Sequence, residues 1–184
     1  MSNHLRILVN ISSQELTVLE NDKCYKRYMI ATAKNGIGQI EGSECTPLGK
    51  HRISEKIGGD APENAVFVGR RWTNELYSEK LAEAQEGRDW ILTRILWLEG
   101  LEKGFNLGKY NPKFDEQNGE AFSASNSEHI VSCDTKKRYI YIHGCPDSHA
   151  MQIPSSHGCI KMRNADIIEL FEMVAIDTFV TIAE

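Results

Sequence analysis

Residues 155–162 read SSHGCIKM, which places a cysteine, Cys159, directly after a glycine and close to a histidine. A second histidine, His143, lies sixteen residues upstream, near the end of the run YIYIHG over residues 139–144. A cysteine is only slightly ionised near neutral pH, so a nucleophilic thiol needs an imidazole that deprotonates it or holds it as a thiolate ion pair. The stretch therefore indicates acyl transfer with Cys159 as the nucleophile, against the simpler alternative of a buried structural thiol.

The residues before His143 alternate as those of a β-strand do. Tyr139, Tyr141 and His143 share one face of the predicted strand, and the two intervening isoleucines share the other. Residues 146–156 hold two prolines and several small polar residues, which predict a loop. Because this loop returns the chain to Cys159, the imidazole and the thiol can meet.

Two histidines compete for the role of the base. His143 leaves a strand end and can reach across to the thiol, whereas His157 is close in sequence but can point elsewhere. We prefer His143 as the base, and His157 then lies either behind the reacting residues as a supporting group or beside the oxyanion. Gly158 can adopt backbone conformations that other residues avoid, and the N–H groups of Gly158 and Cys159 are candidate oxyanion donors.

A zinc site is the alternative interpretation of this region. Five residues within seventeen positions could each bind zinc: His143, Cys145, His149, His157 and Cys159. Their spacings differ from those of the common structural zinc sites, and the chain has no CxxC. We therefore expect no metal and no cofactor.

Basic residues near the motif are candidates for binding a substrate carboxylate. Arg94 shares a strand face with apolar neighbours, so it needs a partner, which is either a structural ion pair or a substrate. Lys161 and Arg163 are competing anchors. The remaining predicted substrate-binding residues are Gly144, Ser156 and Tyr141, although Tyr141 also suits a core position.

Composition indicates one soluble globular domain over residues 1–184. Apolar residues make up 41% and charged residues 26% of the chain. The net charge of −5 argues against nucleic acid or an anionic membrane as a partner. The five cysteines follow no framework spacing, so free thiols are expected.

The first residues predict a strand rather than a signal peptide, because Leu5, Ile7, Val9 and Ile11 lie on one face. No apolar run approaches the length of a membrane span. We therefore expect a cytoplasmic protein.

The rest of the pattern favours a mainly β domain with two or three helices. A strand meander is expected over residues 5–33 with a turn at 20–23, and further strands at 51–54, 90–98 and 179–182. Helices are expected over 74–87 and after Asn164, which suits an N-cap. The second helix would bury a stripe of four residues: Ile167, Leu170, Phe171 and Val174. Residues 104–126 predict an irregular loop with a turn at Asn118-Gly119.

Four motifs together resemble the L,D-transpeptidase catalytic domain family of the YkuD type. The SHGC run at 156–159 and the His-Gly pair at 143–144 are the main two. The TPLG run at 46–49 resembles the family's Thr-Pro-x-Gly element, and NAD at 164–166 resembles the Asn-x-Asp that opens the following helix. The likeness extends from Ile7 to Ile182.

This resemblance implies a β-sandwich or barrel-like fold and a thioester mechanism. Cys159 would attack the carbonyl between meso-diaminopimelate and D-alanine in a peptidoglycan stem tetrapeptide or muropeptide. His143, its ring oriented by a backbone carbonyl, would protonate the leaving amine. Water would then give an L,D-carboxypeptidase product, and an amine would give a 3→3 cross-link or D-amino-acid exchange.

Two positions depart from the family pattern. Cys145 follows His-Gly where the family usually has threonine, and Lys161 stands where arginine is usual. Lysine cannot form the bidentate fork of a guanidinium, so a carboxylate contact there would be a point-charge contact. Cys145 is expected to line the site as a small side chain, and oxidation could join it to Cys159.

The expected place of action favours hydrolysis over cross-linking. Cytoplasmic tetrapeptides arise from recycled wall fragments, so we hypothesise an L,D-carboxypeptidase that trims the terminal D-alanine. The alternatives are an L,D-transpeptidase and a non-catalytic muropeptide-binding protein. The intact His143 and Cys159 pair argues against the last.

Overall fold

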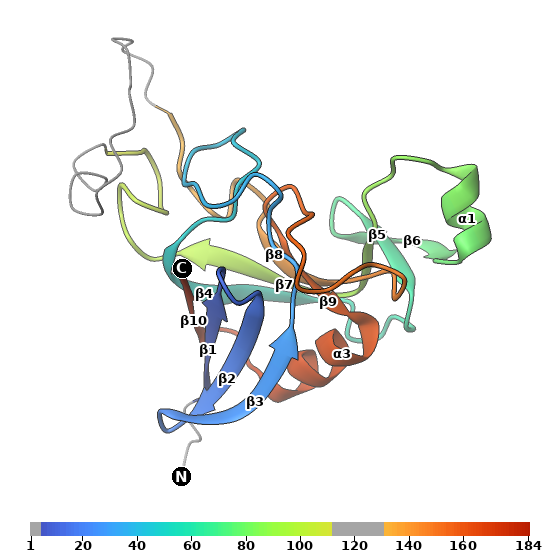
Figure 1. Cartoon of the computed structure of the whole chain (residues 1–184), viewed down its shortest axis with the longest axis horizontal. Coiled ribbons are helices and arrows are strands. Elements are labelled where there is room, and N and C mark those ends of the chain that lie inside the picture. Colours follow the sequence, from blue (N-terminus) through green and yellow to red (C-terminus); the bar gives the residue numbers. More distant parts are fainter. Residues whose placement is uncertain (1–4, 112–130) are drawn as a thin grey trace.

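The computed structural model describes residues 5–111 and 131–184, which form one curled β-sheet with two helices (Figure 1). The chain begins with the predicted meander: β1 (Leu5–Asn10), β2 (Glu15–Glu20) and β3 (Lys23–Met29) pair antiparallel in sequence order. Asn21 and Asp22 between β2 and β3 both have positive φ, 49° and 65°, as a two-residue hairpin turn requires. The meander and its turn are therefore confirmed.

The first and last strands of the sheet pair with each other near its middle. The last strand, β10 (Phe179–Ala183), runs parallel to β1 and antiparallel to β4 (Gly49–Ile57). Strand β4 pairs in turn with β7 (Ile91–Gly100), the longest strand among the described residues. The strands predicted at 51–54, 90–98 and 179–182 are thus present, each slightly displaced or extended.

The segment around residue 76 corrects the prediction of a helix over 74–87. Strands β5 (Ala65–Val68) and β6 (Arg71–Leu76) form a hairpin, and the helix is only α1 (Glu79–Ala84). The helix begins where the Ser78 hydroxyl accepts a hydrogen bond from the Leu81 amide at 3.2 Å. It buries no residue, so no core face supports a longer helix.

The candidate motif lies on two parallel strands. Strand β8 (Tyr141–Cys145) pairs with β7 on one side and with β9 (Ile160–Arg163) on the other. It begins later than predicted because Tyr139 has a φ of 58°, a left-handed conformation that interrupts a strand. Register places His143 opposite Lys161, so the loop between the strands ends close to where it starts.

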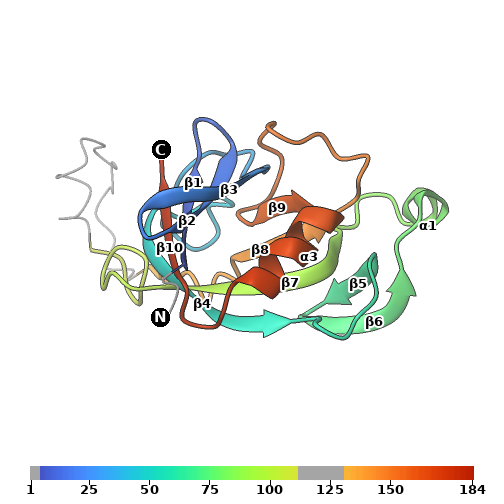
Figure 2. The same ribbon diagram turned by 90° about the horizontal axis from the view of Figure 1, so that it is seen from below.

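Helix α3 (Asn164–Met173) follows β9 directly and covers β7, β8 and β9 (Figure 2). The predicted apolar stripe is confirmed, since its four residues are all buried in the main core. The N-cap is Arg163 rather than Asn164, and no side chain caps the helix. Asn164 instead binds Thr93 at 2.5 Å and Asn64 at 3.0 Å, which joins the helix start to the sheet.

A second, smaller cluster of buried residues lies beneath the β5–β6 hairpin. It contains Ala61, Ala65, Phe67, Ile95 and Tyr141, and Cys159 packs against it. The candidate nucleophile therefore sits at the edge of a packed core. The loop predicted over 104–126 falls largely outside the described residues, and so does its turn at Asn118-Gly119.

Candidate active site

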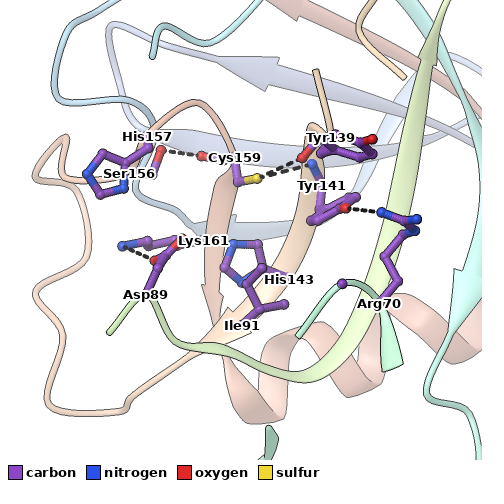
Figure 3. Close-up of a pocket in the computed structure, with 11 residues that line it drawn as sticks. Arg70, Asp89, Ile91, Tyr139, Tyr141, His143, Ser156, His157, Cys159 and Lys161 are labelled. Atoms are coloured by element: carbon purple, nitrogen blue, oxygen red, sulfur yellow. Dashed lines mark hydrogen bonds and ion pairs between the residues drawn. The ribbon is translucent and has the colours of Figure 1, made fainter. Parts of the chain in front are cut away.

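A pocket of about 540 Å³ opens where β8, β9 and the β5–β6 hairpin meet (Figure 3). Cys159 and His143 both line it, so the structure brings together the two residues that the sequence singled out. Its other lining residues are Gly69, Arg70, Asp89, Ile91, Tyr139, Tyr141, Ser156, His157 and Lys161.

Cys159 is held just before β9, with its sulfur turned toward the start of β8. The Tyr141 amide donates to Sγ at 3.3 Å, and the thiol donates to the Tyr139 carbonyl at 3.4 Å. The left-handed Tyr139 turns its carbonyl to this position. The nucleophile candidate is therefore oriented by backbone groups of the strand that carries His143.

The thiol is protonated in this arrangement. Cys159 is only partly buried as a residue, but the protein surrounds its sulfur, and burial raises the pKa of the thiol to about 12. The Tyr141 amide and the charges of Lys161 and Arg138 oppose that rise in pKa without cancelling it. This raised pKa favours the first of the two expectations, in which the imidazole deprotonates the thiol, over a standing thiolate ion pair.

His143 is buried and its ring is fixed by the neighbouring glycine. Nδ1 lies 2.8 Å from the Gly144 carbonyl, which can only accept, so Nδ1 carries the hydrogen and Nε2 of the neutral ring is free of one. Burial lowers the pKa of His143, the charge of Lys161 lowers it further, and Asp89 raises it. The imidazole is thus neutral and able to accept a proton.

Gly158 supplies a backbone shape that other residues cannot adopt without strain. Its φ is 127°, and a Cβ at this position would lie 2.9 Å from Ile140 Cδ1 and 3.2 Å from the Cys45 carbonyl. Thr46 braces the same residue, because its hydroxyl donates to the Gly158 carbonyl at 2.9 Å and accepts from the Ala33 amide at 3.0 Å. The TPLG element therefore supports the nucleophile loop.

Ser156 is buried, lines the pocket and also organises this loop. Its hydroxyl donates to the Cys159 carbonyl at 2.6 Å and accepts from the Gly158 amide at 3.2 Å. Since Gly158 already has this partner, the Cys159 amide is the remaining oxyanion donor of the two that we expected. His157 lines the pocket and is exposed.

Lys161 and Asp89 form an ion pair at one side of the pocket. Lys161 Nζ lies 3.9 Å from Asp89 Oδ1, and the lysine side chain is only 10% exposed. Asp89 precedes β7 and was not singled out from the sequence. A charged residue directly before the apolar run of β7 is the only sequence signal that could have indicated it.

Arg70 lies at the opposite side and was also missed by the sequence analysis. It comes from the tight turn between β5 and β6, and its Nη1 donates to the Tyr141 hydroxyl at 3.1 Å. Burial raises the pKa of that hydroxyl, although the charge of Arg70 opposes the rise. Tyr141 lines the pocket as predicted and also belongs to the smaller core cluster.

Arg94 is not brought to the pocket, which corrects its prediction as a carboxylate anchor. It is buried, and its Nη1 donates to the carbonyls of Ala61 and Thr93, each at 2.7 Å. Its guanidinium lies over the Phe171 ring at 5.6 Å. The role is structural, but backbone carbonyls and a ring take the place of the expected ion pair.

Three further predicted residues lie away from the pocket lining. Arg163 donates to the Asp147 carbonyl at 2.8 Å and so ties down the loop between β8 and β9. Gly144 is buried behind the imidazole that its carbonyl orients. Cys145 is buried and donates to the Met162 carbonyl at 3.3 Å rather than lining the site.

The chain's five cysteines are free. Within residues 5–111 and 131–184, no group of three His, Cys, Asp or Glu side chains is arranged to hold a metal ion. No helix in the same ranges has the length and apolar character to cross a membrane.

Comparison with solved structures finds chains of similar fold. L,D-transpeptidase 3 from Mycobacterium tuberculosis matches with a TM-score of 0.54 and 13% identity, over 99% of this chain and 62% of that one. An L,D-transpeptidase from Mycobacterium smegmatis matches with a TM-score of 0.50 and 12% identity, over 98% and 58%. Bd1075 from Bdellovibrio bacteriovorus matches with a TM-score of 0.51 and 15% identity, over 97% and 47%.

This chain therefore spans less than two thirds of the length of these structures, and at such identities the likeness shows the fold. No curated protein matches the chain. The family model of the L,D-transpeptidase catalytic domain matches residues 4–182. Because that match covers nearly the whole sequence, the chain belongs to the L,D-transpeptidase catalytic domain (YkuD) family.

Proposed function

We propose that this domain cleaves the bond between meso-diaminopimelate and a terminal D-alanine in peptidoglycan tetrapeptides, with Cys159 as nucleophile. The observation that carries the proposal is the shared pocket of Cys159 and His143, with the imidazole held by the Gly144 carbonyl. A thiol and an oriented neutral imidazole lining one cavity are the components that covalent acyl transfer requires.

The proposed mechanism begins from the protonated thiol. A substrate carbonyl entering the pocket would displace the contact of Sγ with the Tyr139 carbonyl, and His143 Nε2 would take the proton as sulfur attacks. The oxyanion would be received by the Cys159 amide. His143 would then give the proton to the leaving amine, which releases D-alanine and leaves a thioester on Cys159.

Water is the proposed second substrate, which makes the reaction that of an L,D-carboxypeptidase. His143 would activate the water as it activated the thiol, and hydrolysis would release the tripeptide. The alternative acceptor is an amine from another stem or a free D-amino acid. Both routes share the same first half, so they are distinguished by their products.

The test is incubation of the protein with free tetrapeptide, with and without an added D-amino acid such as D-methionine. Mass spectrometry should show tripeptide and D-alanine in both mixtures. Products that contain D-methionine, or dimers without tripeptide, would contradict hydrolysis and favour transfer.

Three variants control this assay. Cys159→Ala should abolish release, and His143→Gln should lower it by about 100-fold or more, because general base catalysis contributes about 100- to 10,000-fold. His157→Ala is the matched control on the exposed rim and should retain most activity. Full activity of Cys159→Ala would refute the proposed nucleophile.

We also propose that the substrate is a recycled wall peptide in the cytoplasm. Fractionation of cells that produce the protein at its natural level tests this. Recovery from the periplasm would favour the cross-linking alternative.

A further inference from the structure

Arg70 is a pocket cation whose charge is not balanced by any carboxylate within salt-bridge distance in the described parts of the chain. The other lysine and arginine candidates are engaged. Lys161 pairs with Asp89, while Arg163 and Arg94 donate to backbone carbonyls away from the lining. An anionic substrate group would therefore find its unneutralised partner at Arg70.

The Arg70 guanidinium is held in one orientation. It stacks on Trp97 with 4.2 Å to the ring centroid and lies 5.1 Å from that of Tyr139. Its Nη1 donates a hydrogen bond to the neutral Tyr141 hydroxyl. A planar guanidinium has five N–H donors in a fixed fork, so a pre-oriented one with free donors matches a carboxylate without a further loss of side-chain freedom.

The backbone that presents Arg70 is unusual for a residue with a side chain. Gly69 and Arg70 have φ values of 54° and 65° and form the two-residue turn between β5 and β6. Such turns prefer glycine or asparagine at these positions, so an arginine there carries a conformational cost. The turn aims this side chain at the pocket, where its contacts with three aromatic residues hold it.

One residue connects Arg70 to the reactive sulfur. The Tyr141 amide donates to Cys159 Sγ, and the hydroxyl of the same residue accepts from Arg70. The guanidinium therefore lies about one tyrosine side chain away from the sulfur. The Asp89–Lys161 pair lies on the other side of Cys159 and His143 (Figure 3).

These charges match the two ends of a stem peptide around the scissile bond. The free end of meso-diaminopimelate carries an ammonium and a carboxylate and so has no net charge, as the Asp89–Lys161 ion pair has none. Terminal D-alanine carries a carboxylate alone, which complements Arg70. In this arrangement the charged groups on both sides of the scissile bond face complementary charges of the protein.

We propose that Arg70 is the specificity residue that binds the terminal carboxylate of the leaving D-amino acid. The inference rests on the proposed function and adds to it that the domain selects peptides with a free carboxyl terminus next to the scissile bond. A peptide extended or amidated at that terminus would leave the Arg70 site unfilled.

Binding to the Cys159→Ala protein tests this without turnover. Calorimetry would compare three peptides: the tetrapeptide, its C-terminal D-alaninamide form, and a form amidated instead at the α-carboxylate of D-glutamate. We expect the alaninamide to bind at least about tenfold more weakly than the other two, because it loses a charge-assisted bidentate contact. Adding Arg70→Ala should reduce that difference to about twofold or less.

Arg71→Ala is the matched control, since it removes the same charge from an exposed position on the same hairpin. It should leave the discrimination intact. Equal binding of acid and alaninamide, discrimination that survives Arg70→Ala, or sensitivity only to amidation at D-glutamate would each overturn the proposal. Discrimination without D-alanine release by the unmodified enzyme would refute the hydrolase function and leave the carboxylate site standing.

Discussion

Chemistry at the residue scale depends on a thiol that rests in its protonated form. The Cys159 sulfur is surrounded by protein and bonded to two backbone groups of the Tyr139–Tyr141 segment, while His143 is kept neutral by burial. Because the thiol and the imidazole are both neutral, the resting site avoids the free-energy cost of burying two charges away from water. The proton then moves only when a substrate carbonyl makes the transfer favourable.

This resting state predicts a distinctive pH dependence of alkylation. Because burial raises the pKa of Cys159 to about 12, its thiolate fraction should grow about tenfold per pH unit from pH 7 to 10 without a plateau. Iodoacetamide modification, followed by peptide mapping, measures the rate at Cys159, with the exposed Cys24 as an internal reference. A plateau below pH 8 would reveal a thiolate held as an ion pair instead.

At the scale of elements, the site depends on loops that brace one another. Thr46, just before β4, is buried and fixes the Gly158 carbonyl on a loop that is 112 residues away in sequence. Glycine has more backbone freedom than any other residue, so the loop at Gly158 needs outside support to keep Cys159 in place.

Replacing Thr46 with valine should therefore weaken both the fold and the reaction. The change leaves the Ala33 amide and the Gly158 carbonyl without their partner, at a cost of about 1–3 kcal/mol in the free energy of unfolding. D-alanine release should fall by about tenfold or more as Cys159 loses its position. Urea unfolding and the release assay measure these effects.

Thr46→Ser keeps the hydroxyl and serves as the control. It should retain most of the stability and activity. If the valine variant behaves like the serine variant, the Thr46 brace does not support the nucleophile loop.

The elements also explain which parts of the site could be predicted from sequence. Cys159, Gly158 and His143 are near in sequence, and a strand followed by a loop is enough to bring them together. Asp89 and Arg70 lie 70 and 89 residues before Cys159, so only the pairing of β7 with β5 and β8 places them at the pocket. Strand pairing between distant segments is not encoded in local periodicity.

The errors in the predicted secondary structure have a similar cause. The apolar residues near Leu76 fit a helical spacing, but pairing of β6 with β5 outweighs that local preference. Asn164 suits an N-cap by residue type, yet its side chain is used to bind Thr93 and Asn64. In both cases a contact with a distant part of the chain determines the structure, and the local sequence pattern does not contain that contact.

At the scale of the whole molecule, stability should depend on histidines that are buried uncharged. His51 on β4 is fully buried between the Gly49 carbonyl and the Thr135 hydroxyl, and burial lowers its pKa from 6.5 to about 4. The unfolded chain therefore binds a proton at a higher pH than the native protein does. Stability from this group is complete above about pH 6.5 and is lost as the pH falls toward 4.

The difference between 6.5 and about 4 corresponds to a loss of at most about 3 kcal/mol, at roughly 1.4 kcal/mol per pH unit. Urea unfolding between pH 7 and 4.5 measures it, and His51→Gln should flatten the pH dependence. His143 contributes in the same direction, so His143→Gln is a second comparison. An unchanged slope in the His51 variant would show that this residue is not the titrating group.

The proposed reaction requires a covalent bond between Cys159 and the substrate. Rapid quenching of the enzyme with tetrapeptide, followed by intact-mass and peptide-mapping analysis, measures that bond directly. The prediction is a mass gain equal to the tripeptide acyl group, located on Cys159, together with released D-alanine. Release of D-alanine with no adduct on Cys159, or undiminished release by Cys159→Ala, would contradict it.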